Sequence, residues 1–258
     1  MGGPAPHHAD KILAEGVLLG LFMVAACIGA TVLEGPDAGL HEAVADPFLR
    51  RCLMGLAMGF VAVALIESPM GRRSGAHMNP AVTLTLCRLG RIDRGLAACY
   101  VLSQCLGAIA GVGLSRLVLG AGLAAPGVDW VVTFPGRGGV LGAFVGEVLI
   151  SAILFGAVLA GAGTRFERHL SKVAGALLFL FIAFEAPFSG MSLNPARSLG
   201  SAVWSGNWTA FWVYVVAPIG AMVVVGQFSG GRRGRASTGG EARRPEARSG
   251  ATLRTGGG

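Results

Sequence analysis

A pattern that occurs twice constrains the fold of this chain more than any other feature. Residues 74–84 read SGAHMNPAVTL and residues 189–199 read SGMSLNPARSL, so both segments share Ser-Gly, a central Asn-Pro-Ala and a final Leu. Asn is favoured as a helix N-cap and Pro at the first helical position. A single copy would be interpreted as a turn. Because the segment recurs, we expect two short helices that begin in the same way. Their first residues are Asn79, Pro80 and Ala81 in one copy and Asn194, Pro195 and Ala196 in the other.

The rest of the chain has the composition of a membrane protein. Only 14% of the 258 residues are charged, against about 25% in an average soluble domain. The five cysteines form no CxxC pair, which excludes a disulfide scaffold and a cysteine metal site. A membrane-spanning helix needs about 20 apolar residues. The stretches that meet or approach this length are Gly16–Leu33, Cys52–Ile66, Gly95–Ser115, Gly138–Thr164, Val173–Phe184 with an extension to about Phe188, and Trp208–Phe228.

The two repeated segments fall between these spans and are too short to cross a bilayer. The apolar stretches Asn79–Cys87 and Asn194–Trp204 are typical of re-entrant segments. Such segments are stable at membrane depth only when they are buried in protein or line a water-filled cavity. Each half of the chain then has three spans and one half-helix, and an odd number of spans places the second half upside down. We therefore predict an all-α membrane protein with six transmembrane helices and two re-entrant half-helices in an inverted 3+3 repeat.

The predicted organisation of the chain follows from these spans. Its expected parts are an N-terminal cytoplasmic segment (1–10), a first repeat (11–120), an extracellular connector (121–137), a second repeat (138–228) and a disordered basic tail (229–258).

Charge orients the predicted spans in the membrane. Basic residues concentrate between the second and third spans, between the fourth and fifth, and in the tail, whereas the loop at 34–48 is acidic. The positive-inside rule therefore predicts that both termini are cytoplasmic, with Arg50 and Arg51 as exceptions on the outer side. The tail has a net charge of +5 of the total +7, so no basic domain remains to bind nucleic acid. The tail is interpreted as solvated, with contact to anionic lipid as the alternative.

With both copies of the motif and the inverted repeat in view, the chain resembles the major intrinsic protein family, the aquaporins and glycerol facilitators. The resemblance covers about residues 11–228 and includes SGAH before the first Asn-Pro-Ala and ARSLGSA after the second. It implies a bacterial-type passive channel for water and small neutral solutes such as glycerol. It also implies a homotetramer in the lipid bilayer of the plasma membrane, of the bacterial inner-membrane type, with no enzyme activity, cofactor or metal.

The resemblance also assigns residues to the pore. Asn79 and Asn194 would form the inner filter, where two helix N-termini repel cations. The outer filter would contain Arg197, together with the aligned residues Met58, Ile182 and Met191. The carbonyl groups expected to line the pore belong to Gly75, Ala76, His77, Gly190, Met191 and Ser192.

Two carboxylates lie at span depth, Glu15 and Glu147. The resemblance implies that they brace the re-entrant loops by accepting backbone N–H groups, and burying them without partners would cost several kcal/mol. A proton relay through them is the alternative. His77 is interpreted as a loop anchor rather than a metal ligand, and Gln104 as a second candidate to hold a loop.

The filter positions give conflicting indications of the cargo. Water channels of the family typically have Phe and His where this chain has Met58 and Ile182, which favours a wider, facilitator-like constriction. Ser198 and Ala202, however, are the residues typical of water channels. We expect water conduction with leakage of small neutral solutes, and a glycerol-type facilitator is the alternative. An ion-coupled transporter, which also uses inverted repeats, and an intramembrane enzyme, for which the chain has neither GxSxG nor HExxH, are the competing classes.

Overall fold

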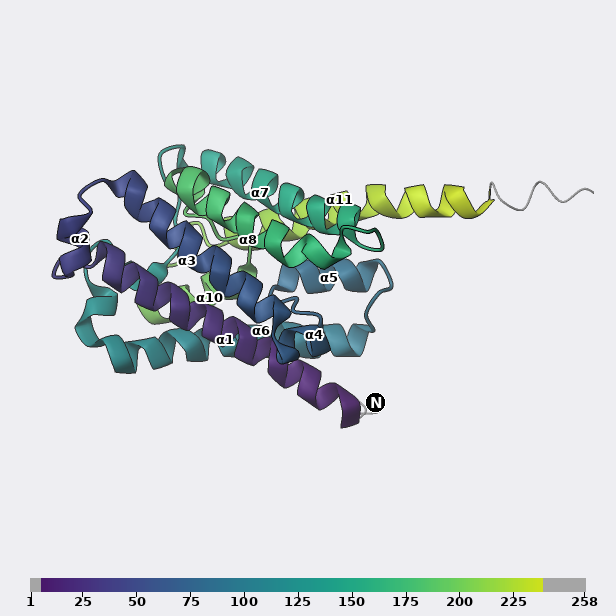
Figure 1. Cartoon of the computed structure of the whole chain (residues 1–258), viewed down its shortest axis with the longest axis horizontal. Helices are drawn as coiled ribbons and strands as arrows, with labels where there is room; N and C mark the ends of the chain where they lie inside the picture. Colours follow the sequence, from purple (N-terminus) through teal and green to yellow (C-terminus); the bar gives the residue numbers. More distant parts are fainter. Residues whose placement is uncertain (1–5, 239–258) are drawn as a thin grey trace, which may run out of the picture.

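The computed structural model describes the backbone of residues 6–238 and the side chains of residues 8–228, and within this range it is a bundle of helices without strands (Figure 1). The predicted all-α fold is confirmed. The long helices are α1 (Pro6–Glu34), α3 (Pro47–Glu67), α6 (Arg94–Leu119), α7 (Gly139–Gly161), α8 (Leu170–Leu180) and α11 (Val213–Thr238). The shorter ones that matter for the site are α4 (Pro69–Ser74), α5 (Pro80–Arg88), the π-helical turn η4 (Phe181–Glu185), α9 (Ala186–Ser189) and α10 (Pro195–Ser205).

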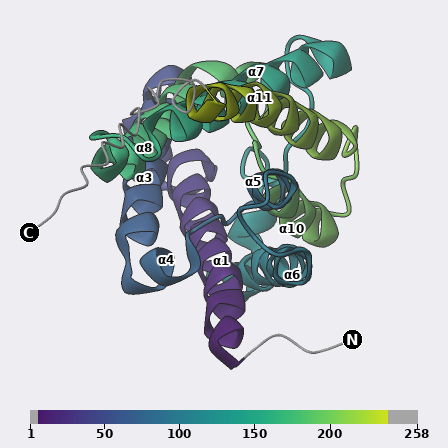
Figure 2. The ribbon, with the colours of Figure 1, turned by 90° about the vertical axis from the view of Figure 1, so that its right-hand side faces the viewer.

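The helices pack in the same way in the two halves of the chain. In the first half α1 packs against α6, and in the second half α7 packs against α11. Each half-helix then leans on the last long helix of the other half, α10 on α6 and α5 on α11, while α3 and α8 pack together between the halves (Figure 2). This exchange joins the two halves into one bundle.

Within the described residues, five helical segments are long and apolar enough to cross a membrane, and α11 supplies a shorter apolar segment, Val213–Phe228. The start of α1 and the far end of α11 lie at the same end of the bundle (Figure 1), as an even number of crossings requires. The helix α11 begins at Val213 rather than at the predicted Trp208. The chain turns just before it, where Ala210 has a positive φ of 50° and the Phe211 N–H donates to the Trp208 carbonyl.

At its other end, α11 continues through residues 229–238, into the segment expected to be disordered. Arg and Ala are good helix formers and occur in this stretch together with three glycines, which are poor ones. The remainder of the predicted tail, residues 239–258, and residues 1–5 of the predicted N-terminal segment lie outside the described residues.

Glycine pairs allow helices of the bundle to approach closely. A Cβ on Gly107 of α6 would overlap the backbone carbonyl of Gly16 on α1, and a Cβ on Gly59 of α3 would lie 2.7 Å from the Gly175 carbonyl oxygen on α8. Small residues at such positions let helices meet backbone to backbone in lipid. The pair Gly142 and Gly146 differs, because a Cβ on Gly142 would meet nothing within 4 Å and a Cβ on Gly146 would meet a side chain, that of Glu185.

The connector before α7 is more structured than the sequence indicated. It contains two 3₁₀ turns, Gly120–Ala124 and Asp129–Val131, and buries Leu123 and Val128 in the core. On the same side of the bundle, Arg50, an exception to the positive-inside rule, has partners within the protein. Its Nε donates to Glu34 Oε2 over 2.9 Å and its Nη1 to the Val44 carbonyl over 2.9 Å. Arg50 therefore holds the acidic loop against α3.

Candidate functional site

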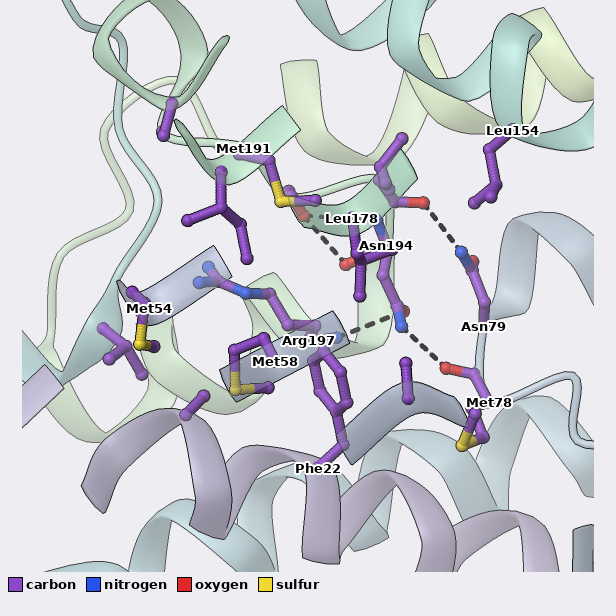
Figure 3. A pocket seen from close by; sticks show the side chains of 18 of the residues that line it. Phe22, Met54, Met58, Met78, Asn79, Leu154, Leu178, Met191, Asn194 and Arg197 are labelled. Carbon is purple, nitrogen blue, oxygen red and sulfur yellow. Dashed lines mark hydrogen bonds between the residues drawn. The ribbon is translucent and has the colours of Figure 1, made fainter. Parts of the chain in front are cut away.

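The two Asn-Pro-Ala segments meet in the middle of the bundle and are hydrogen-bonded across the halves (Figure 3). Asn79 Nδ2 donates to the Leu193 carbonyl over 2.8 Å, and Asn194 Nδ2 donates to the Met78 carbonyl over 2.6 Å. Each Asn also caps its own half-helix, since Asn79 Oδ1 accepts from the Ala81 N–H at 2.8 Å and Asn194 Oδ1 from the Ala196 N–H at 3.1 Å. Each amide nitrogen has two protons, so a proton beyond the bridge remains for a passing oxygen atom.

Pro80 and Pro195 are the first residues of α5 and α10, as predicted from the motif. Ala81 and Ala196 follow them and are fully buried behind the Asn side chains. Because both half-helices begin at the bridge between the halves, their partly positive N-terminal ends lie close together.

Glu15 lies behind the first re-entrant loop and is saturated with donors. It is fully buried on α1 and accepts from Ser74 Oγ, the His77 and Met78 backbone N–H groups and Gln104 Nε2, at 2.7, 3.0, 2.6 and 2.8 Å. Hydrogen bonds to a charged group contribute about 1.5–3 kcal/mol each. This set of bonds gives the buried carboxylate the partners that its burial requires.

Glu147 lies behind the second loop in the corresponding way. It is fully buried on α7 and accepts from Ser189 Oγ at 3.1 Å and from the backbone N–H groups of Ser192 and Leu193 at 2.6 and 2.8 Å. Ser192 also bonds Ser198 through their hydroxyl groups. The same kind of contact therefore recurs in both halves, with a carboxylate facing a Ser-Gly turn and two consecutive N–H groups.

Two tyrosines, which were not predicted from the sequence, also hold the re-entrant loops that Glu15 and Glu147 brace. Tyr100 OH donates to the Ser74 carbonyl over 2.9 Å, and Tyr214 OH donates to the Ser189 carbonyl over 2.6 Å; both side chains are buried. They are the only tyrosines in the chain. A signal was available, because the two follow the two Ser-Gly pairs at nearly the same spacing, on the last long helix of each half.

A cavity of about 730 Å³ runs beside the bridged loops. Its wall includes a stripe along α3 that reaches from Arg51 to Ile66, which corresponds to about 22 Å of helix at 1.5 Å per residue. One end of the cavity is lined by Glu34 and Asp129, and the other end by Leu86 and Ser171. The cavity therefore extends along most of the length of the spans, as a path through a membrane must.

The carbonyl-bearing residues of both loops lie on this cavity. They are Gly75, Ala76, His77, Gly190, Met191 and Ser192. Ala76 and Met191 have positive φ angles of 46° and 50°, an uncommon conformation for residues other than Gly. His77 is held on the wall by Thr83, whose Oγ1 is 3.1 Å from its Nδ1.

The predicted outer-filter residues also line the cavity. Arg197, Met58, Ile182 and Met191 all contribute to its wall, and Met58 and Met191 are only 2% and 8% exposed. Arg197 Nη1 is buried and has no hydrogen-bond partner among the described residues. Figure 3 shows its side chain reaching into the pocket beside Met58. The guanidinium thus retains a donor for an oxygen atom in the cavity.

Further lining residues were not singled out from the sequence. Met54 lies one turn before Met58 on α3 and lines the cavity that Arg197 also lines (Figure 3). The connector contributes Val128 and Phe134 to the wall. No motif marks these residues, because an apolar side chain at helical spacing has the same signature whether it lines a cavity or the core.

Comparisons with known proteins agree with this architecture. A family model described as major intrinsic protein matches residues 5–227. Aquaporin NIP1-1 of Zea mays is 34% identical over 218 residues, 81% of this chain and 70% of the relative, and aquaporin Z of Rhodopseudomonas palustris is 30% identical over 228 residues, 82% and 88%. The crystal structure of the aquaglyceroporin from Plasmodium falciparum superposes with a TM-score of 0.71 at 24% identity, covering 86% of this chain and 96% of that one, and so has the same fold.

The match extends over nearly all the described residues, and it includes both half-helices and the spans that surround them. Their arrangement around one cavity is that of a channel rather than an enzyme. The chain therefore belongs to the major intrinsic protein family, whose members are channels for water and small solutes.

Proposed function

We propose that this protein is a passive water channel that also admits small neutral solutes such as glycerol. The cavity beside the bridged Asn79 and Asn194 carries this proposal, because it runs along the spans and offers hydrogen-bond donors from two facing half-helices. A water molecule that leaves bulk solvent needs replacement partners at such depth. The carbonyl groups of Gly190, Met191 and Ser192 can accept its protons, and the Asn amides and Arg197 can donate to its oxygen.

Exclusion of ions follows from the same groups. The N-terminal ends of α5 and α10 each carry roughly half a positive charge, and Arg197 adds a full charge on the cavity wall. Cations, including hydronium, are therefore repelled from both sites. We assign to Glu15 and Glu147 the role of bracing the loops, because their oxygens are occupied by loop donors and neither residue lines the cavity.

The proposed cargo rests on the side chains around Arg197. Met58, Ile182 and Met191 present thioether and aliphatic groups on the wall of the cavity that Arg197 also lines. Such a wall contacts the carbon atoms of a polyol favourably, while Arg197 and the carbonyls bond its hydroxyl groups. The facilitator alternative predicts that glycerol crosses as readily as water.

Paired stopped-flow measurements on proteoliposomes test this function. Water permeability should exceed that of protein-free liposomes, and glycerol should also cross measurably. Glycerol flux equal to that of protein-free liposomes, beside robust water flux, would show a strict water channel. Uptake of a solute against its gradient, driven by protons or sodium, would instead indicate a coupled transporter.

Arg197→Val tests the proposed filter. The variant should leak cations or larger solutes, because it removes the charge from the cavity wall and leaves more space there. Since Arg197 Nη1 has no hydrogen-bond partner among residues 8–228, the variant should still fold, and Arg137→Val, at an exposed position before α7, serves as the control. Unchanged selectivity in the same stopped-flow assay would contradict the filter role.

The membrane arrangement and assembly are part of the proposal. We propose a homotetramer in a plasma membrane of the bacterial inner-membrane type, with both termini cytoplasmic. The shared end of the bundle for α1 and α11 supports a common side for the termini, and the basic residues Arg72, Arg73 and Arg91 support its cytoplasmic assignment. Native mass spectrometry tests the tetramer, and labelling of a cysteine introduced at position 10 from either side of a vesicle tests the orientation.

A further inference from the structure

A third carboxyl group lies beside the second re-entrant loop, where the sequence showed only an apolar span. Glu185 ends the π-helical turn η4, and π turns inside helices often occur at functional sites. Ser189 Oγ lies 2.9 Å from Glu185 Oε2 and 3.1 Å from Glu147 Oε1, and it accepts the Met191 N–H at 3.0 Å. One hydroxyl group therefore lies between two carboxyl groups.

The number of protons in this cluster determines the state of Glu185. A serine hydroxyl has one proton and two lone pairs, and Met191 occupies one of the lone pairs. If both carboxyl groups were ionised, the single hydroxyl proton could serve only one of them. The backbone N–H groups that Glu147 accepts favour its ionised form. A proton on Glu185 Oε2 completes the cluster, because Glu185 then donates to Ser189 and Ser189 donates to Glu147.

The surroundings of the other carboxyl oxygen, Oε1, also favour the protonated form of Glu185. Oε1 is buried and has no hydrogen-bond partner among the described residues. It rests against α7 at Gly146, where even a Cβ would overlap it. An anionic oxygen without a donor is costly to bury, whereas the carbonyl oxygen of a neutral carboxyl group is much less so.

No basic side chain within residues 8–228 forms an ion pair with Glu185. The charged and titratable residues on the elements packed around it are Glu147 on α7, Tyr214 on α11, Arg51 on α3 and Arg137 before α7. Arg197 on α10 acts on Glu147 and Tyr214 rather than on Glu185. Arg51 directs its Nε to the Ala183 carbonyl, and Tyr214 directs its hydroxyl to the Ser189 carbonyl. Among residues 8–228, none of these forms an ion pair with Glu185.

We propose that Glu185 is held in its protonated form and positions the second re-entrant loop, and that its ionisation lowers the permeability of the channel. An ionised Glu185 takes the hydroxyl proton of Ser189 away from Glu147 and repels that carboxylate. The loop that Glu147 and Ser189 hold, with Met191 and Ser192 on the cavity wall, then loses part of its support. The proposal rests on the proposed function for its permeability readout only.

Water permeability of proteoliposomes at a series of pH values tests the proposal. The wild-type permeability should fall as the pH rises. Glu185→Gln should abolish this pH dependence and retain the permeability of the low-pH state, because its amide donates to Ser189 as the acid does. Glu185→Ala should be less permeable at every pH, and Glu167→Gln, at an exposed loop carboxylate, should retain the wild-type profile. A wild-type permeability that does not depend on pH, or a Glu185→Gln profile like that of the wild type, overturns the proposal.

Infrared spectroscopy separates this inference from the proposed function. The carbonyl stretch of a protonated carboxyl group should be present in the wild type at neutral pH and absent from Glu185→Gln. If this band is the same in both proteins, the inference fails while the channel function stays intact. If no variant conducts water at any pH, the channel function fails, and the band still reports the protonation of Glu185.

Discussion

The two re-entrant loops have the same brace but different surroundings. In each, a buried carboxylate accepts a serine hydroxyl and two consecutive N–H groups, and a tyrosine holds the serine carbonyl. The first loop adds Gln104, which donates to Glu15, whereas the corresponding position on α11, four residues after Tyr214, is Pro218. The second loop instead has Glu185 beside its serine, where the first has Met70. In the first loop four donors face one carboxylate, whereas in the second loop one serine hydroxyl lies between two carboxyl groups.

The largest difference in stability between the two loops is expected when the buried carboxylate of each loop is removed in turn. Glu15→Ala leaves the Ser74 hydroxyl, two backbone N–H groups and one of the two Gln104 amide protons without an acceptor, while the other amide proton still reaches Thr83 Oγ1. Each unpaired buried group costs about 1–3 kcal/mol. After Glu147→Ala, only the Ser189 hydroxyl and two backbone N–H groups lose their acceptor, so fewer donors remain unpaired. Glu15→Ala should therefore be more destabilising by about 1–3 kcal/mol.

Denaturant titration of both variants in the same detergent micelles measures this difference. Glu42→Ala, at an exposed position in the acidic loop, controls for the loss of one negative charge. Equal losses of stability in Glu15→Ala and Glu147→Ala, or a larger loss for Glu147→Ala, would contradict the prediction that Glu15 stabilises its loop more than Glu147 does.

Glycine substitutions extend the comparison to the helices behind the loops. Gly107→Ala places a Cβ into the Gly16 carbonyl, and overpacking of this kind costs about 1–3 kcal/mol. The corresponding position on α11 is already Ala221, so α7 and α11 tolerate a methyl group where α1 and α6 do not. The matched control is Gly142→Ala on α7, which meets nothing within 4 Å and should be close to neutral. Thermal unfolding in detergent should rank Gly107→Ala well below Gly142→Ala, and a reversed ranking would show that the close contact is not required.

The smallest expected effects concern the tyrosine that donates to the serine carbonyl in each loop. Tyr100→Phe and Tyr214→Phe each remove one hydroxyl bond to a serine carbonyl. A neutral hydrogen bond contributes about 0.5–1.5 kcal/mol, so both variants should lose about this amount, and by similar margins. The same titration measures both variants, and a large loss in one alone would show that the tyrosines are not equivalent.

Much of this architecture could be predicted from the sequence, because it rests on local and repeated signals. The Asn-Pro-Ala segments gave the half-helix starts, the apolar runs gave the spans, and the odd number of spans per half gave the inversion. The fold class and the family are confirmed. The pore roles of Met58, Ile182 and Arg197 remain predictions, although all three line the cavity.

What could not be predicted depends on contacts between distant segments. Glu185 was overlooked inside an apolar span, and the repeat gave no indication of it because the first half has Met70 at that place. Arg50 pairs with Glu34 across a loop whose path no motif fixes. The wall contributed by Val128 and Phe134 depends on how the connector folds back over the bundle.

The crossed bonds of Asn79 and Asn194 also have a consequence for the order of synthesis. Asn79 needs the carbonyl of a residue 114 positions later, and Asn194 donates to one 116 positions earlier. The first half leaves the ribosome well before the acceptor for Asn79 exists. Closing contacts of such sequence separation is slow, so the centre of the protein is completed only after the second half-helix has entered the membrane. A chain interrupted between the halves would hold an unfinished loop with an unpaired amide, which a quality-control protease could recognise.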